Sequence, residues 1–524
     1  MKKQTDIGEK TNIVLITTDQ QRFDTIGAYG FDFAKTPNLD TLANDCTMYS
    51  QAYSPNPACV PARHNIITGL PCRYHTFAKN YFENETQIPY DIPTFPHILS
   101  DQGYDTIAIG KMHFSPTRRS NGFNKLYLME EIPRYRDDDE YAQYLEQQDL
   151  GNIQSLHGVR HLLYMYPQQS LIPEMHHGSK WVANKTIEAI RLNRGTRPFM
   201  LWSSFIEPHP PFDVPEEFSH LYDDVDLPDM YESDTPVGAI AEENKTIAQG
   251  MTQEQLRRAK QLYYCAVSYV DHQVGRIIKE LKSAGLYDDT MIIFTSDHGE
   301  MLGDNGTFQK FLPYDASTHV PMMVKFPKNR KGTVPEDSFV DLNDLLPTIL
   351  DVAGCPYPAE YHLPGESLLA PNPEKDRSLQ YVEYQMEEQR WVSLRTHEYK
   401  YNYYYGGGKE ELFHLSEDAR EQRNLLADKN QEARSIADML RKKLIELEYA
   451  QGLPGGVENG DFVIRKNYEP SMYAERNFPI FPSHLSAEES RNMIGLVDEM
   501  IMATKNEPTV HLNDFNLTEL PGVQ

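Results

Sequence analysis

The chain has few cysteines and lacks long apolar runs. Its 524 residues include five cysteines, Cys46, Cys59, Cys72, Cys265 and Cys355, and no two of them form a Cys-x-x-Cys pair. An odd, sparse set of this kind predicts neither a disulfide framework nor a zinc site of the paired type. No apolar run is long enough to span a bilayer, so we expect no membrane segment.

Positive charge is also scarce. Lys and Arg number 50 against 77 Asp and Glu, a formal net charge of −27. This balance argues against nucleic acid or an anionic membrane as a partner. It does not exclude a small anionic substrate, because charges in salt solution are screened beyond about 8 Å and local cations then decide binding.

The first residues, 1–10, are polar and lead directly into an apolar run at 13–16. They lack the apolar region and the small-residue cleavage site of a signal peptide. We therefore expect a cytoplasmic protein.

Most of the chain alternates buried strands with helices. Continuous β-branched and apolar runs predict strands buried on both faces at 12–18, 104–109, 199–205, 291–295 and 320–326. Helical patterns between them favour an α/β fold, a large doubly wound and mostly parallel sheet flanked by helices. We expect this domain to occupy residues 1–372, with 117–178 as a polar insertion over the cleft.

A smaller α+β domain is expected at 373–524, after a Pro-rich linker. Short alternating segments there predict a short antiparallel sheet, followed by a helix at 432–449. Its strands are expected at 379–384, 391–395, 399–405 and 412–415. The last part, from 452 onward, has weak signals and is expected to wrap the surface as a tail.

Polar residues follow four predicted strands where each strand ends. They are Asp19-Gln20, Lys111 with His113, His209, and Asp297-His298. Singly, each has an ordinary explanation, such as a helix cap, a solvated lysine, a loop histidine or a turn. Ligands bind outside the carboxyl ends of strands in open parallel sheets, so together they predict one site. Asp19 and Asp297 are oxygen ligands suited to Ca²⁺, Mg²⁺ or Mn²⁺.

Cys59 stands just before Val60-Pro61 and a predicted helical stretch that stops at Gly69. Pro favours the first turn of a helix, so Cys59 is expected at a helix N-terminus, where an anion is stabilised. Arg63, one turn later, lies on the same face. For this motif alone, a buried cysteine beside a surface arginine would be the simpler interpretation.

The run Cys59-Val60-Pro61-Ala62-Arg63, followed by Thr68-Gly69, resembles the signature of the formylglycine-dependent sulfatases of the alkaline-phosphatase-like superfamily. The resemblance implies that Cys59 is oxidised to formylglycine by a maturation enzyme. It also implies a divalent metal held by Asp19, Gln20, Asp297 and His298. Ca²⁺ ranks first, with Mn²⁺ or Mg²⁺ as alternatives.

The resemblance assigns roles to further residues. Gly110-Lys111-Met112-His113 is similar to a sulfatase motif in which Lys111 binds sulfate and His113 takes the proton that releases it. His209, held between two prolines, is implied to protonate the leaving group, and Arg63 to stabilise the formylglycine hydrate. Lys310 is similar to a second sulfate-binding lysine. Asn80 matches a substrate-binding asparagine of the phosphonate monoester hydrolases.

Two features separate the branches of this superfamily. The Gln20 and His298 pair is similar to the phosphonate monoester hydrolase and choline sulfatase branch, whereas the phosphonate hydrolases lack the Lys111–His113 motif. We expect a sulfuric ester hydrolase acting on a small sugar or aryl sulfate. The alternatives are a phosphonate or phosphate ester hydrolase, and a non-catalytic sulfated-glycan binding protein in which Cys59 stays a thiol. The oligomeric state is open.

Overall fold

The computed structural model describes residues 10–512 with gaps at 81–85, 134, 154–155, 160–163, 234–237, 246, 249, 329, 359, 373–375, 429, 469–498, 501 and 503–507. Residues 1–9, on which the expected localisation depends, lie outside the described residues, as does most of the predicted tail.

The strands predicted from the sequence and the helix predicted at 432–449 fall close to observed elements, and the structure adds further strands and helices. The strands are β1 (Asn12–Asp19), β2 (Thr47–Tyr49), β3 (Ala52–Tyr53), β4 (Asp105–Gly110), β5 (Lys125–Leu128), β6 (Phe199–Pro208), β7 (Thr290–Ser296), β8 (Met322–Lys325), β9 (Val340–Asp341), β10 (Gln380–Tyr384), β11 (Trp391–Arg395), β12 (Tyr399–Tyr404), β13 (Lys409–His414), β14 (Val457–Glu458) and β15 (Asp461–Phe462). The helices are α1 (Pro37–Ala43), α2 (Cys59–Thr68), α3 (Cys72–His75), α4 (Phe95–Asp101), α5 (Glu140–Gln147), α6 (Gly178–Asn193), α7 (Glu216–Ser219), α8 (Ala239–Lys245), α9 (Gln253–Ser283), α10 (Asp315–Thr318), α11 (Leu345–Ala353) and α12 (Gln431–Gln451).

One large sheet organises the first part of the chain. Its seven strands have the order β2-β8-β7-β1-β6-β4-β5. β7, β1, β6, β4 and β5 run parallel, while β8 is antiparallel to both β7 and β2. The predicted α/β fold with a mostly parallel sheet is confirmed, and the antiparallel pairing is confined to one edge.

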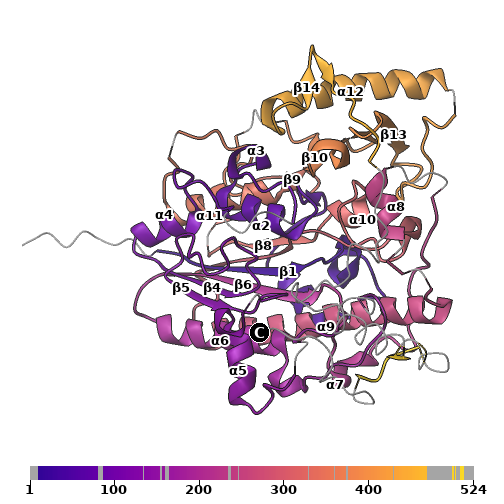
Figure 1. Ribbon diagram of the computed structural model, residues 1–524. Helices are drawn as coiled ribbons and strands as arrows, with labels where there is room; N and C mark the ends of the chain where they lie inside the picture. The colour runs from indigo at the N-terminus through magenta and orange to yellow at the C-terminus, as the bar shows by residue number, and fades with distance from the viewer. Residues whose placement is uncertain are drawn as a thin grey trace, which may run out of the picture.

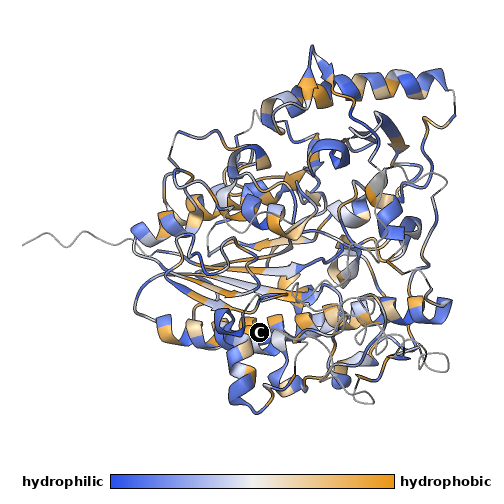
Figure 2. Ribbon diagram, viewed as in Figure 1, coloured by the Kyte–Doolittle hydropathy of each residue, from blue (hydrophilic) through white to orange (hydrophobic). Residues whose placement is uncertain are grey.

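Helices cover both faces of this sheet (Figure 1). Along β1, Ile13 and Leu15 pack with α2 and α11 on one face, and Val14 and Ile16 pack with α6 and α9 on the other. Successive side chains of a strand point to opposite faces, so an unbroken apolar run belongs to a sheet covered twice. Figure 2 shows hydrophobic residues along these strands and a mixture of hydrophobic and hydrophilic residues on the flanking helices.

A second sheet lies beyond the large one (Figure 1). Its four antiparallel strands, β10-β11-β12-β13, match the predicted meander, and α12 packs on it. A buried ion pair between Arg390 and Glu448 of α12 ties the helix to the sheet. The predicted second sheet is confirmed, while the domain boundaries stay a prediction.

The segment 117–178 differs from the prediction. We expected an insertion outside the core, yet it contributes the edge strand β5 and the helix α5, and Leu128, Tyr141 and Leu145 are fully buried. An edge strand of four residues carries too short an apolar pattern to be recognised in a polar stretch.

Among the described residues, no helix is both long and apolar enough to cross a membrane.

Candidate active site

Two acidic residues meet because their strands are neighbours. β1 and β7 pair in parallel up to Thr18 and Ser296, so Asp19 and Asp297 leave the same edge of the sheet side by side. The backbone N–H of Gln20 donates to Asp297 Oδ1 at 3.1 Å, which fixes the turn after β1. Both carboxylates are fully buried. The predicted convergence at the strand ends is therefore present for this pair.

Helix α2 begins at Cys59, and this places the thiol against the two acids. Cys59 Sγ lies 3.6 Å from Asp19 Oδ1 and 3.2 Å from His298 Nε2. The free N–H of Val60, in the first turn, donates to Asn80 Oδ1 at 3.1 Å. Asn80 thus lies at the helix N-terminus beside Cys59.

Arg63 joins the acids from one turn along α2. Its Nε donates to Asp297 Oδ2 and its second terminal nitrogen to Asp19 Oδ2, each at 2.9 Å, while the remaining nitrogen donates to Ser204 Oγ at 2.8 Å. The guanidinium is fully buried, and the acids outweigh its desolvation and raise its pKa. In this geometry Arg63 holds the two carboxylates.

The oxygens that Arg63 leaves free form a metal-sized cluster. Ligand atoms of Asp19, Cys59, Asp297 and His298 all lie within 4.8 Å of one another. His298 Nδ1 is 3.0 Å from the carbonyl of Gly299, which can only accept, so Nδ1 carries a proton, and Nε2 faces Asp19 and Asp297. Two carboxylate oxygens and an imidazole suit a divalent ion.

Gln20 is placed differently from the other predicted ligands. Its Oε1 accepts from Lys310 Nζ at 2.6 Å, and its Nε2 donates to the buried carboxylate of Glu300. Its amide oxygen therefore binds a metal only by sharing or giving up the bond to Lys310.

Burial and charge set the protonation of the cluster. Burial and the charge of Asp19 raise the pKa of Cys59, but Lys111, Lys310 and His298 outweigh them and hold it well below its usual value. Burial likewise raises the pKa of Asp19, but Lys111, His209 and Arg63 hold it well below its usual range. Burial, with Asp19 close by, raises the pKa of Asp297 to about 6.

The glycine before Lys111 allows its side chain to reach the site. Its Nζ lies 2.7 Å from Asp19 Oδ2 and 3.7 Å from Cys59 Sγ. Gly110 before it has φ +93°, and a Cβ there would lie 1.9 Å from the carbonyl oxygen of Ser204. Only glycine fits this close approach, which turns the end of β4 into the site.

His209 and Lys310 form the other side of the site. Lys310 Nζ lies 2.9 Å from His209 Nε2, and His209 Nδ1 lies 2.6 Å from the carbonyl of Pro210. That carbonyl requires the proton on Nδ1, so Nε2 accepts from Lys310. Burial, assisted by Lys310 and Lys111, lowers the pKa of His209 to about 4.

His113 lies apart from the cluster. Its backbone N–H donates to Glu130, and its Nδ1 has no hydrogen-bond partner in the described part of the chain. Within the described residues, no hydrogen bond or ion pair joins its imidazole to Cys59 or the acids. Its role as the base that releases sulfate stays a prediction.

Sequence reasoning missed two carboxylates. Glu300 accepts from Gln20 and from the backbone N–H of Gln309, and thereby fixes the chain just before Lys310. Glu131, just after β5, reaches Lys111 and His209. Glu300 stands two residues after His298 and could have been noticed, whereas Glu131 had no local signal.

The chain matches a known family over most of its length. The profile described as Sulfatase matches residues 11–355, and one described as N-sulphoglucosamine sulphohydrolase, C-terminal, matches residues 303–450. The chain belongs to the sulfatase family. The resemblance is thereby confirmed, and the protein is a sulfuric ester hydrolase. Neither the formylglycine nor the roles of individual residues follow from this match.

Named relatives and solved structures agree with this assignment. An arylsulfatase of Clostridium perfringens is 30% identical over 87% of this chain and 98% of its own, and a choline-sulfatase of Rhizobium meliloti is 30% identical over 66% and 68%. The sulfatase also superposes on the phosphonate monoester hydrolase of Agrobacterium radiobacter with a TM-score of 0.70. The two proteins are 23% identical, and the superposition covers 87% of this chain and 100% of the other, so it shows the shared fold.

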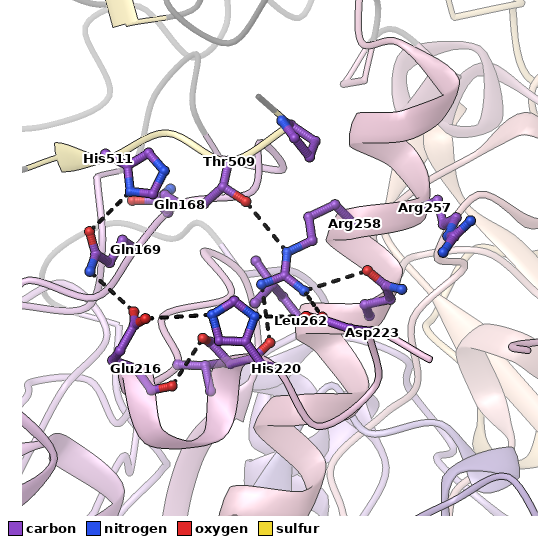
Figure 3. Close-up of a pocket in the computed structure, with 14 residues that line it drawn as sticks. Gln168, Gln169, Glu216, His220, Asp223, Arg257, Arg258, Leu262, Thr509 and His511 are labelled. Carbon is purple, nitrogen blue, oxygen red and sulfur yellow. Dashed lines mark hydrogen bonds and ion pairs between the residues drawn. The ribbon is translucent and has the colours of Figure 1, made fainter. Parts of the chain in front are cut away.

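A separate hollow of about 390 Å³ lies against α9 (Figure 3). It is lined by Gln168, His220, Arg258 and, from the far end of the chain, Thr509 and His511. Val510 pairs with Gln168, so this piece of the predicted tail returns to the large sheet's side of the molecule. None of the cluster around Cys59 lines the hollow, and we do not assign the reaction to it.

Replacing Gly110 by Ala tests how Lys111 is positioned. We expect kcat/KM for a sulfate ester to fall about a hundredfold, because the clash with Ser204 displaces Lys111 by a fraction of an ångström or more. Gly103→Ala is the matched control, since Gly103 has φ +87° with nothing within 4 Å of the added Cβ. It carries the same left-handed strain of about 1–2 kcal/mol and should retain turnover. Equal losses in both variants would contradict this account.

Proposed function

We propose that this sulfatase hydrolyses a sulfate monoester of a sugar or an aryl alcohol, with Cys59 converted to formylglycine beside a divalent metal. One observation carries the proposal. At the start of α2, Cys59 Sγ lies 3.6 Å from Asp19 Oδ1, 3.2 Å from His298 Nε2 and 3.7 Å from Lys111 Nζ. A tetrahedral anion placed there would meet cations and a nucleophile together.

Asp19, Asp297 and His298 would hold the metal, and Gln20 would join them after releasing Lys310. Bound there, the ion would supply Lewis acidity toward a sulfate oxygen and toward the nucleophile. We rank Ca²⁺ first among the candidate ions because two of the ligands are carboxylates. The imidazole ligand makes Mn²⁺ a stronger alternative than Mg²⁺.

The chain's own residues supply the remaining chemistry. As a formylglycine hydrate, residue 59 would offer a hydroxyl that attacks sulfur. Lys111 and Lys310 would bind the sulfate oxygens as charge develops on them. His209, which accepts from Lys310 Nζ, would pass a proton from this pair to the leaving alcohol. Asn80 holds the start of α2 next to the substrate.

The names of relatives support the substrate class. They include an arylsulfatase of Clostridium perfringens and an iduronate 2-sulfatase of Mus musculus, the latter 28% identical over 67% of this chain and 70% of its own. One solved structure of the same fold is described in complex with its substrate D-glucosamine-2-N,6-O-disulfate. Sugar and aryl sulfates are therefore the first compounds to test.

Metal identity can be read from thermal stability without any turnover. Adding Ca²⁺ to metal-free protein should raise the unfolding midpoint, because an ion that binds only the folded state stabilises it in proportion to the logarithm of its concentration. Asp297→Asn should abolish the rise. A rise with Mn²⁺ and none with Ca²⁺ would reverse our ranking, and no rise with either ion would contradict the site.

Mass spectrometry of the peptide around Cys59 tests the modification. We expect the aldehyde form, which is lighter than the thiol, in protein produced together with a maturation enzyme. Cys59→Ala should lower turnover at least about a thousandfold, since the nucleophile is removed. Cys46→Ala, at a cysteine outside the site, should retain it. An unmodified thiol in a fully active sample would favour a different nucleophile.

A second candidate is hydrolysis of a phosphonate or phosphate ester. The amide of Gln20 and the imidazole of His298, beside the two carboxylates, favour it, because this pair is similar to that of the phosphonate monoester hydrolase and choline sulfatase branch. Assaying one preparation on an aryl sulfate and an aryl phosphonate separates the two. We expect the larger kcat/KM on the sulfate, and negligible sulfate turnover beside rapid phosphonate turnover would replace our proposal.

A further inference from the structure

Glu131 places a carboxylate inside the group of cations that surrounds Cys59. Its Oε2 lies 2.5 Å from Lys111 Nζ, and its Oε1 lies 3.4 Å from His209 Nε2. A carboxylate oxygen of Glu131, Cys59 Sγ and a ring nitrogen of His209 all lie within 4.8 Å of one another. The side chain is 8% exposed.

This position is the one that an anionic substrate needs. Sulfate oxygens must approach Lys111 while sulfur approaches residue 59, and Glu131 already pairs with Lys111 and lies beside His209. Asp19 and Asp297, the two acids of the candidate metal site, form ion pairs with Arg63. Glu131 comes from a different part of the chain, three residues after the edge strand β5.

We propose that Glu131 is a specificity-determining residue that distinguishes the monoanionic ester from dianionic inorganic sulfate. This inference rests on the proposed sulfate-ester hydrolysis at Cys59. In the free enzyme, the carboxylate neutralises Lys111 next to His209. The ester displaces it from Lys111, and after hydrolysis its charge helps to expel the product.

The physical basis is that Coulomb repulsion scales with the charge of the ligand. A sulfate monoester carries one negative charge, and the inorganic sulfate that leaves carries two. A carboxylate about 4 Å away disfavours the ester by about fivefold in affinity under the full screening of bulk water and by more at a buried position. We take about tenfold for the ester, and the dianion is then disfavoured by about the square of that factor. The carboxylate therefore weakens the binding of the product more than the binding of the substrate.

The location makes the repulsion effective. Lys111, His209 and the neighbouring Lys310 are buried, so water and salt screen the interaction less than they would at the surface. Lys111 is shared between Asp19 and Glu131, at 2.7 and 2.5 Å, so any sulfate oxygen that binds it competes with a carboxylate already present.

Glu131→Gln tests the proposal, because glutamine keeps the shape and a hydrogen-bond acceptor for Lys111 while removing the charge. In the metal-loaded enzyme, we expect the dissociation constant of inorganic sulfate, measured by calorimetry, to fall about a hundredfold. The KM for an aryl sulfate should fall only about tenfold. Product inhibition by sulfate should strengthen in parallel.

Asp137→Asn is the matched control, since it removes one charge from an exposed part of the same segment, in the turn before α5. It should change neither constant. A Glu131→Gln variant whose sulfate affinity is unchanged or weaker, or whose KM and sulfate constant shift by the same factor, would overturn the proposal. If Glu131 had only a structural role, the substitution would weaken the binding of the ester and of inorganic sulfate together.

The calorimetric measurement of sulfate binding does not depend on turnover. If the wild-type protein cleaved no sulfate ester, the proposed function would fail, yet the binding of inorganic sulfate to the two proteins would still report on Glu131. If turnover were normal and sulfate binding identical in both, only the role of Glu131 would fail.

Discussion

The buried ion pairs of Arg63 with Asp19 and Asp297 are the interaction on which the site depends. Two carboxylates without water cannot both stay ionised at this separation unless a cation compensates them. Arg63 does so with two of its nitrogens, each 2.9 Å from a carboxylate oxygen. Removing one partner of a buried pair typically costs about 3–5 kcal/mol. The pairs therefore fix α2 against the ends of β1 and β7, and with α2 they fix Cys59.

The site also shows how a protein with a net charge of −27 can bind an anion. Three buried cationic side chains, Arg63, Lys111 and Lys310, lie around one thiol, and they hold its pKa well below the usual value despite its burial. Over such short distances the local charges outweigh the distant negative surface, which salt screens. Glu131 adjusts this balance from within, which makes the affinity a matter of individual side chains.

Much of the candidate site was predictable because chain direction in a parallel sheet brings strand ends to one edge. Asp19, Lys111, His209 and Asp297 each follow an apolar run, and the structure places them together. His113 did not follow this rule: three residues past β4, the chain has already turned, and its imidazole makes no bond to the cluster within the described residues. Glu131 was not predictable because it follows a short edge strand whose partner could not be known locally.

The sequence by itself determined the fold class, the edge of the sheet where the candidate site lies and the family, because apolar periodicity and a contiguous motif are properties of neighbouring residues. Only the tertiary structure decided that Arg63 pairs with two acids, that Gln20 is bonded to Lys310, and that Glu131 lies among the cations. These contacts join residues tens to hundreds of positions apart, and their geometry depends on how strands and loops pack, which no local pattern records.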